Sequence, residues 1–413
     1  MKSLKKAKVE NKTVLLRADL DVPLEKQQSG TLAVKDDFRI LKSLETINWL
    51  RQQRAKTVII SHIDRPNGFQ PEHSLLPVAH HISGLLDLKM IEVDKNTKKL
   101  PHYAIPHFFF FTDDISSESV KMHIADLNPG DVCMLENIRF YKEETKGDES
   151  FAKKLASLGD AYVNDAFGVS HRNHASITAL PKFLPHYPGL HMEDEIKILQ
   201  AAVKFPKKPF IVVIGGIKLS SKLDGLVGLI EKADKVLVGG GLAAEFFLAK
   251  DFNVGNSIVE AGLKTITRNL LRNNKDKIIL PIDVVVATNP KKTASIEVVK
   301  PENIPPDKMV LDIGPATIQE FAGHIKKAKT IVWSGPLGLF EEHSFSHGTK
   351  AIARLIASRS SGFAQGFAGG GNTVDALSEI GMIQDLDFIS SGGGAMLQYL
   401  SSGTLPGIKI LEK

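Results

Sequence analysis

The chain has 413 residues, which is long for a single hydrophobic core, so two domains are expected. Its content of 43% hydrophobic and 24% charged residues is typical of a globular protein, and its net charge of +5 suits a protein that handles small anions without requiring nucleic acid. Because no arginine-rich run is interleaved with aromatic residues and no apolar run approaches the thickness of a bilayer, we expect neither a nucleic-acid partner nor a membrane span.

Short apolar runs alternate with amphipathic stretches along the whole chain, a pattern typical of α/β proteins with parallel sheets. In the first half, strands are expected at Thr13–Ala18, Lys56–Ile60, Lys89–Val93, His107–Phe111, Val132–Leu135 and Ala161–Asn164. In the second half, they are expected at Pro209–Ile214, Lys235–Val238, Val284–Ala287, Met309–Ile313, Thr330–Trp333 and Asp387–Ile389.

Helical spacing and proline clusters complete the outline. The prolines between Pro181 and Gly189 predict the domain boundary, and the amphipathic run Met192–Val203 predicts a connecting helix. Two helix faces are predicted by apolar residues at helical spacing: Ile40, Leu41, Leu44, Ile47 and Leu50, and then Leu223, Leu226, Val227 and Ile230.

The only cysteine, Cys133, lies in an apolar run, so a buried thiol is expected. A single cysteine cannot form a disulfide within the chain, which suits a reducing compartment, the cytoplasm.

Charged side chains follow the expected strands of the first half. Ligands of parallel sheets bind at the carboxyl ends of the strands, so these positions are informative. Each cation alone is more often a surface charge, but their shared rim favours an anion site, and guanidinium groups suit a phosphate and a carboxylate on one substrate. The rim residues are Asp19 and Asp21, then His62, Asp64 and Arg65, then Arg139, and finally Asp165, His171 and Arg172, with Arg39 joining from a helix start.

Glycines follow the expected strands of the second half. Glycine lets backbone N–H groups approach a ligand closely, although tight turns would explain any single case. Six glycine-containing strand ends in one half favour a nucleotide site. They lie at Gly215-Gly216, Gly239-Gly240-Gly241, Gly314-Pro315, Gly335-Pro336, Gly369-Gly370-Gly371 and Gly392-Gly393-Gly394.

The first of these turns carries two lysines, Lys218 and Lys222, between an expected strand and an expected helix. Such a turn can hold an anion on its N–H groups, and lysines beside it can follow a phosphate during transfer. The alternative is a loop with two ordinary surface lysines. A P-loop is excluded, because its Gly-x-x-x-x-Gly-Lys-Ser/Thr spacing is absent.

From about Val14 to the C-terminus, the chain resembles phosphoglycerate kinase. The motifs of the first half are Leu16-Arg17-Ala18-Asp19-Leu20-Asp21-Val22-Pro23, Ser61-His62-Ile63-Asp64-Arg65-Pro66, Leu135-Glu136-Asn137-Ile138-Arg139-Phe140, Val163-Asn164-Asp165-Ala166-Phe167-Gly168 and His171-Arg172. Those of the second half are Gly215-Gly216-Ile217-Lys218 with Lys222, Trp333-Ser334-Gly335-Pro336-Leu337-Gly338-Leu339-Phe340-Glu341, Gly369-Gly370-Gly371-Asn372-Thr373 and Ser391-Gly392-Gly393-Gly394-Ala395.

The resemblance implies two Rossmann-like, doubly wound parallel-sheet domains joined by a hinge helix. Residues 1–189 would bind 3-phosphoglycerate, residues 190–205 would form the hinge, residues 206–392 would bind the magnesium complex of ATP or ADP, and residues 393–413 would return to the first domain. The reaction implied is ATP + 3-phosphoglycerate = ADP + 1,3-bisphosphoglycerate, catalysed by a monomer whose cleft closes around both substrates.

The resemblance also assigns roles by position. The acid substrate would contact Asp19, Leu20, Asp21, Arg39, His62, Ile63, Asp64, Arg65, Arg139 and Arg172. The nucleotide would contact Gly216, Lys218, Lys222, Gly240, Gly314, Pro336, Glu341, Gly370, Gly371, Asn372 and Thr373. Because the carboxylate acceptor is already ionised at neutral pH, no general base is needed, and Arg39, Lys218, Lys222 and Gly393 would neutralise the migrating group.

Several positions depart from the family pattern. The family usually has Asn at Asp21, Gly at Asp64, Ala at Ile217, Asn at Ser334, Asp at Asn372 and Glu at Gln398. Asn372 stands at the magnesium-linked position, where an amide offers an oxygen without the charge. We also expect the two added aspartates to pair with neighbouring arginines. An alternative is therefore a catalytically weakened homologue that binds nucleotide or a partner in a regulatory role.

Overall fold

The computed structural model describes residues 1–101, 103–291 and 295–412. Contacts divide the chain into unit 1, Met1–Ile196 with Leu405–Lys413, and unit 2, Lys197–Thr404. The division falls within helix α6 (Leu190–Lys204) and not at the proline cluster, where β9 (His186–Pro188) instead completes the sheet of unit 1.

The frame of unit 1 is a parallel seven-stranded sheet with the order β5-β6-β7-β4-β1-β8-β9. The six strands predicted from apolar runs are confirmed, with ends that differ by at most one residue. They are β1 (Thr13–Arg17), β4 (Lys56–Ile60), β5 (Met90–Val93), β6 (Phe108–Phe111), β7 (Val132–Leu135) and β8 (Ala161–Asn164).

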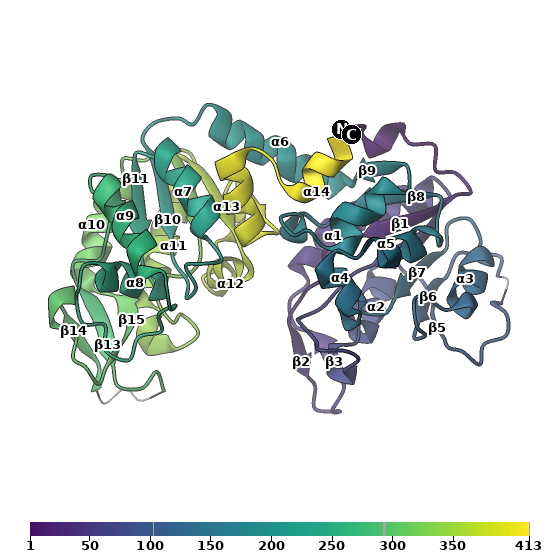
Figure 1. The fold of residues 1–413 in the computed structure, drawn as a ribbon, viewed down its shortest axis with the longest axis horizontal. Helices are drawn as coiled ribbons and strands as arrows, with labels where there is room; N and C mark the ends of the chain where they lie inside the picture. The colour runs from purple at the N-terminus through teal and green to yellow at the C-terminus, as the bar shows by residue number, and fades with distance from the viewer. Residues whose placement is uncertain (102, 292–294, 413) are drawn as a thin grey trace. The chain divides into compact units, whose positions relative to one another are not determined.

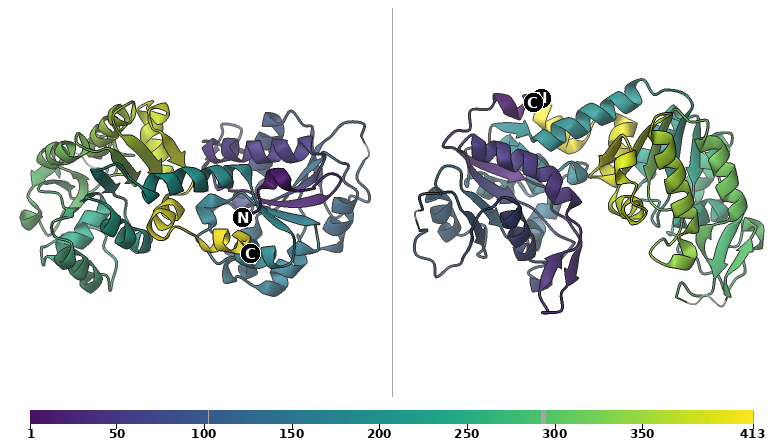
Figure 2. Two further views of the ribbon diagram at one scale, coloured as in Figure 1. Left: turned by 90° about the horizontal axis from the view of Figure 1, so that it is seen from above. Right: turned by 180° about the vertical axis from the view of Figure 1, so that it is seen from behind.

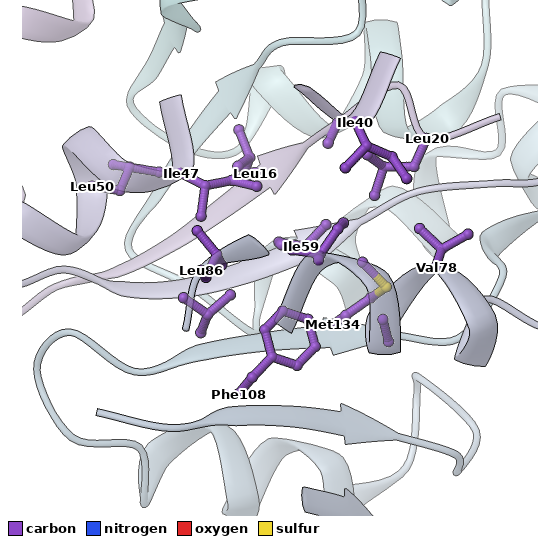
Figure 3. Close-up of a cluster of buried hydrophobic side chains, with 14 of the residues drawn as sticks. Leu16, Leu20, Ile40, Ile47, Leu50, Ile59, Val78, Leu86, Phe108 and Met134 are labelled. Carbon is purple, nitrogen blue, oxygen red and sulfur yellow. The ribbon is translucent and has the colours of Figure 1, made fainter. Parts of the chain in front are cut away.

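Both faces of this sheet are covered, because side chains alternate between them along each strand. On one face, α1 (Phe38–Gln52) and α2 (Leu76–Leu85) pack their apolar residues against Leu16, Ile59 and Met134 (Figure 3). On the other face, α3 (Glu118–Ala125) and α5 (Glu149–Ala156) cover Leu15 and Cys133, whose thiol is buried as predicted.

One residue of the predicted α1 face is misplaced. Ile40, Ile47 and Leu50 are buried and Leu44 is partly buried, but Leu41 is about half exposed. The apolar stripe follows the i, i+3, i+4 and i+7 positions from Ile40, and Leu41 lies beside that stripe.

Smaller elements complete unit 1. The antiparallel hairpin β2 (Leu24–Lys26) and β3 (Leu32–Val34) projects from its body (Figure 2). The C-terminal helix α14 (Pro406–Lys409) is fixed by the Gly407 N–H, which donates to the Ser170 carbonyl at 2.8 Å. A Cβ on Gly407 would lie 2.7 Å from the Ile177 side chain, so glycine permits this close packing.

Unit 2 contains a parallel six-stranded sheet with the order β12-β11-β10-β16-β17-β18, of which the neighbours β10 and β11 are labelled in Figure 1. Its strands are β10 (Phe210–Ile214), β11 (Lys235–Val238), β12 (Ile278–Ile279), β16 (Thr330–Ser334), β17 (Gln365–Gly369) and β18 (Phe388–Ser390). The short strand β12 and the strand β17 were not predicted, although the glycines that end β17 were identified.

Two predicted strands belong to a different sheet. β13 (Val284–Ala287) pairs in antiparallel fashion with β14 (Glu297–Val299) and β15 (Met309–Ile313), so the expectation that these runs join the parallel sheet was wrong. In β13, Val284 and Val286 are buried while Val285 is only partly so, the alternation of a sheet with one buried face.

The helices of unit 2 lie around its six-stranded and three-stranded sheets. They are α7 (Leu223–Lys232), α8 (Gly241–Ala249), α9 (Lys264–Asn273), α10 (Pro315–Ile325), α11 (His347–Ser360), α12 (Gly371–Glu379) and α13 (Gly393–Ser402). Helix α8, for example, packs against β13 of the three-stranded sheet. No helix in the described ranges is both long and apolar enough to cross a bilayer.

Helix α13 packs against α7, and two glycines of α7 make this contact possible (Figure 1). A Cβ on Gly225 would lie 2.7 Å from Leu397, and one on Gly228 would overlap the Ser401 hydroxyl. Val227 is exposed rather than buried, because the buried face of α7 follows Leu226 and Leu229. Helix α13 belongs to unit 2, so the segment that groups with unit 1 begins at Leu405 and not at Gly393.

Candidate functional site

The basic rim of unit 1 arises from the sheet order. Strands β7, β4, β1 and β8 are neighbours, and parallel strands present their carboxyl ends at one edge. The segments that follow them carry Arg139, His62, Asp19 with Asp21, and Asp165. Two predicted residues contribute no side chain to this edge: Leu20 and Ile63 are buried in the apolar core.

Arg39, Asp21 and His62 form one part of the rim. Arg39 Nη1 donates to the Asp21 carbonyl at 2.7 Å and lies 3.7 Å from both Asp19 Oδ1 and Asp21 Oδ2. His62 Nε2 lies 3.7 Å from the same Asp21 Oδ2. The Asp21 carboxylate thus lies beside Arg39 and His62, two groups that an anionic substrate would need. Its contact with Arg39 is the predicted pairing with an arginine.

Arg17, which the sequence reasoning missed, fixes the tautomer of His62. Its guanidinium is buried and lies 3.0 Å from His62 Nδ1. Because arginine has only donors, Nδ1 must accept, and the imidazole proton must lie on Nε2. Burial, followed by the positive charges of Arg17 and Arg139, holds the pKa of His62 well below its usual range, so the ring is a neutral Nε2–H donor.

The charge of Arg17 is balanced below the rim. Its Nε donates to Ser176 Oγ at 3.0 Å, and that hydroxyl donates to Glu144 Oε1 at 2.7 Å. Burial raises the pKa of Glu144, while Arg17 and the two donors of Ser176 act against the rise. A charged residue at the end of an apolar strand was the sequence signal for Arg17.

Asp64 adopts a left-handed backbone conformation, with φ of +54°. Asp and Asn tolerate this region better than most residues other than glycine. Its N–H donates to Asp21 Oδ1 at 2.9 Å, and its carbonyl accepts from Arg139 Nη1 at 2.6 Å. Its carboxylate lies 3.2 Å from His73 Nδ1, so the expected pairing of Asp64 with an arginine was wrong.

A pocket of 490 Å³ lies beside these residues in unit 1. Its lining includes three arginines expected from the sequence, Arg65, Arg139 and Arg172. It also includes two lysines and a histidine that were not predicted: Lys142, Lys146 and His174. Lys142 and Lys146 come from the short helix α4 (Lys142–Lys146), four residues apart, which was the available signal.

The electrostatic potential of this pocket is positive. Burial, then Arg17, lowers the pKa of Arg139 to about 10. Burial, then Arg139, lowers the pKa of His174 to about 3, and burial with Arg172 lowers that of His171 to about 4. Both histidines are therefore neutral at physiological pH, and the pocket offers several cations and neutral donors to an anion.

The lysine turn of unit 2 follows β10 in the chain. β10 and β16 are neighbours in the sheet, and the strand order reverses between them. Lys222 Nζ donates to the Gly215 carbonyl at 2.5 Å and to the Ser334 carbonyl at 3.1 Å. Burial lowers its pKa to about 8. The Lys218 side chain is exposed, and Gly216, with φ of +99°, donates its N–H to the Pro336 carbonyl at 2.8 Å.

Glycines precede or begin the helices around this turn. Gly240, Gly314, Gly370 and Gly392 are the N-caps of α8, α10, α12 and α13, so the capping residue itself offers no side chain to the first N–H groups, and of these helices α10 is capped from another segment by the Asp283 carboxylate. Such helix starts attract anions. The starts of α12 and α13 are close together, because a Cβ on Gly393 would lie 2.7 Å from Gly370 Cα. Gly371 and Asn372 open α12 and are exposed.

Three predicted nucleotide residues have evident roles in the fold. The Thr373 hydroxyl accepts from the Gly335 N–H at 2.7 Å and donates to the Gly369 carbonyl at 3.1 Å. Gly314 has no room for a Cβ beside the Asp283 carboxylate, which caps α10. Pro336 offers its carbonyl to Gly216, whereas Glu341 is exposed after β16.

The described side chains of unit 2 do not build a metal site by themselves. Among residues 1–101, 103–291 and 295–412, no three histidine, cysteine, aspartate or glutamate side chains are grouped to hold a metal. The exposed amide of Asn372 offers one neutral oxygen. This donor set fits a magnesium ion that phosphates carry, and it does not fit a cation held by protein alone.

Comparisons with known proteins agree with this geometry. The family model for phosphoglycerate kinase matches residues 4–403. A phosphoglycerate kinase from Borreliella afzelii is 41% identical over 408 residues, covering 97% of this chain and 96% of the relative, and one from Aquifex aeolicus is 40% identical over 409 residues, covering 98% and 96%.

Solved structures give the same result. The phosphoglycerate kinase from Pyrococcus horikoshii OT3 superposes with a TM-score of 0.81 at 28% identity, and the alignment covers 100% of this chain and 98% of that one. The enzyme from Coxiella burnetii gives 0.75 at 31% identity with the same coverage. The chain belongs to the phosphoglycerate kinase family.

Proposed function

We propose that the protein transfers a phosphoryl group between ATP and the carboxylate of 3-phosphoglycerate, giving ADP and 1,3-bisphosphoglycerate. Family membership supports the reaction, and one observation carries the assignment of the acceptor site. The cationic pocket of Arg65, Arg139 and Arg172 is linked to Arg39 and the Nε2–H of His62 through Asp64, which accepts from Arg139 and donates to the Asp21 carboxylate that both contact. A substrate with a phosphate at one end and a carboxylate at the other matches this pair.

On the acceptor side, guanidinium groups bind the phosphate, and Arg39 with His62 orients the carboxylate. The carboxylate is the nucleophile and is already ionised, so no residue has to remove a proton. Asp21 competes for Arg39 and must yield part of that contact when the substrate binds.

On the donor side, the phosphates bind to Lys218, Lys222 and the N–H groups at the starts of α12 and α13 near Gly370 and Gly393. With a pKa of about 8, Lys222 is mostly protonated at neutral pH, and a nearby phosphate favours the charged form. These groups neutralise charge on the migrating phosphoryl group as it moves toward the carboxylate. The nucleoside would extend toward Gly240, Gly314, Pro336 and Glu341.

We propose that magnesium enters as part of the nucleotide substrate, with Asn372 near its phosphates. When bound, the ion supplies charge neutralisation on the phosphate oxygens. We also propose that the enzyme acts as a monomer in the cytoplasm, as its single buried thiol suits.

A coupled assay with 3-phosphoglycerate, ATP and magnesium tests the proposed function. The wild-type protein should turn over, and Lys222→Ala should lower kcat by roughly 100-fold, the usual cost of losing one preorganised charge-stabilising group. Thermal unfolding of both proteins checks that the variant is folded. Absence of wild-type turnover would refute the proposed reaction, and full activity of Lys222→Ala would refute the role of this lysine.

A further inference from the structure

The two lysines of the turn after β10 are positioned in different ways. The Lys222 ammonium is held by the carbonyls of Gly215 and Ser334, whereas the exposed Lys218 ammonium makes no hydrogen bond with another described residue. The position of Lys218 therefore depends on the backbone of the turn. Local bonds shape that backbone: Ser221 Oγ donates to the Lys218 carbonyl at 2.9 Å, and the Lys222 N–H donates to the Leu219 carbonyl at 2.9 Å.

A carboxylate from a distant loop also holds this turn. Glu260, in the connection between α8 and α9, accepts the Ser220 N–H at Oε2, at 2.8 Å, and the Ser220 hydroxyl at Oε1, at 2.5 Å. The two donors of Ser220, with a smaller contribution from Lys218, hold the pKa of Glu260 below its usual range, so the carboxylate is ionised at neutral pH. Hydrogen bonds to an ionised acceptor are stronger than neutral ones.

Glu260 is itself fixed to the body of unit 2. Its N–H donates to Oε1 of Glu245, a fully buried residue of α8. The same loop is anchored earlier, where Ser257 Oγ accepts the Val310 N–H at 3.0 Å and the Asn256 N–H donates to the Lys308 carbonyl at 2.8 Å. A carboxylate on an anchored loop can restrain a mobile turn, whereas one on a free loop would move with it.

Helix α8 links this restraint to the glycine-rich helix starts. The Leu242 N–H donates to the Gly216 carbonyl at 3.0 Å, and a Cβ on Gly241 would lie 3.2 Å from Ile217 Cα. The start of α8 thus contacts the turn before Lys218, while Glu245, about one turn further along the same helix, accepts the Glu260 N–H.

We propose that Glu260 is a positioning residue for phosphoryl transfer: through Ser220 it fixes the turn that presents Lys218 and Lys222 to the migrating phosphoryl group. This inference rests on the proposed roles of the two lysines. It assigns Glu260 no contact with substrate. Its removal should therefore reduce the alignment of the lysines, which affects kcat more than the binding of either substrate.

Steady-state kinetics of Glu260→Ala, Glu260→Asp and Glu260→Gln test the proposal. We expect Glu260→Ala to lower kcat about 10-fold with the KM for 3-phosphoglycerate unchanged, because small displacements of catalytic groups are costly. Glu260→Gln, which keeps the shape and one acceptor oxygen, should lose less, and Glu260→Asp should recover part of the loss. Glu302→Ala removes an exposed carboxylate of the same unit that makes no hydrogen bond or ion pair with another described residue, and it should match the wild type.

A double-mutant cycle tests the stated route. If Glu260 acts through Ser220, then Ser220→Ala with Glu260→Ala should be no slower than Glu260→Ala alone. Amide hydrogen exchange of Ser220 should accelerate in Glu260→Ala, a readout that needs no catalysis. If Glu260→Ala is too unstable to assay, the isosteric Glu260→Gln and its exchange rate decide the question.

Two results would overturn the inference. Wild-type kcat in a folded Glu260→Ala, while Lys218→Ala is impaired, would show that the turn needs no restraint from Glu260. If Ser220→Ala and Glu260→Ala each lower kcat equally and the double variant loses the sum of both effects, Glu260 acts independently of Ser220. By contrast, full activity of both Lys218→Ala and Lys222→Ala would refute the proposed lysine roles themselves.

Discussion

The contact between Asp21 and Arg39 predicts that this chain binds its acid substrate more weakly than it could. Asp21 Oδ2 lies 3.7 Å from Arg39 Nη1. At an effective dielectric constant of about 40, such a pair is worth about 2 kcal/mol, and its partial exposure reduces this to about 1 kcal/mol. A substrate carboxylate that recruits Arg39 must overcome that amount, which corresponds to roughly fivefold in affinity.

The change Asp21→Asn removes the competing charge and leaves an amide that can donate to the substrate. We expect the KM for 3-phosphoglycerate to fall about fivefold in low salt, with the KM for ATP unchanged. The gain should shrink at roughly 0.5 M salt, because exposed charges are screened. Asp126→Asn is a matched control, since that carboxylate makes no hydrogen bond or ion pair with another described residue. An unchanged or higher KM for 3-phosphoglycerate in low salt would refute this reasoning.

Two further predictions concern stability. Gly335 has φ of +90°, and a Cβ there would overlap Lys222 Nζ and the Gly215 carbonyl. Gly335→Ala should therefore destabilise the protein by about 2 kcal/mol and lower kcat. A variant with the thermal unfolding and the kcat of the wild type would contradict this. Burial and Arg139 lower the pKa of His174 to about 3, so below pH 6.5 the unfolded chain takes up a proton that the folded protein does not. The contribution of His174 to the free energy of unfolding is full above pH 6.5. It is lost as the pH falls, by about 2 kcal/mol between pH 7 and pH 5. Urea unfolding of His174→Gln should show a pH dependence weaker by that amount, and an equal dependence would exclude the assignment.

The strand ends of both sheets could be predicted from the sequence because buried parallel strands are short, continuous apolar runs. Once these runs were placed, the residues after β1, β4 and β7 identified Asp21, His62 and Arg139 without knowledge of the strand order. The prediction failed where a run such as Val284–Ala287 was equally compatible with an antiparallel sheet. Pairing direction depends on the connections between strands, which apolar periodicity does not report.

Other parts of the acceptor site could not be predicted because they come from helices or from below the rim. Lys146 and His174 reach the pocket from α4 and from the segment before a helical turn, so no strand end marks them. The direction of a side chain is also set by neighbours far apart in sequence. The backbone of Asp64 is left-handed, and its N–H donates to Asp21 while its carbonyl accepts from Arg139. With the backbone held in this way, the Asp64 carboxylate lies beside His73.

Glycine content alone could not separate a tight turn from a nucleotide site in unit 2, because the same glycines suit both. A Cβ on Gly240 would lie 2.8 Å from the Pro336 carbonyl, and one on Gly393 would lie 2.7 Å from Gly370 Cα, so each strand end packs directly against another backbone. Helices α12 and α13 begin at such glycines without a hydrogen bond from a capping side chain, and bare N–H groups are the feature that an anion needs. The tight-turn interpretation of these glycines and the proposed nucleotide site are therefore compatible with each other. The acceptor site differs, because its charges belong to side chains that can be read in the sequence and exchanged one at a time.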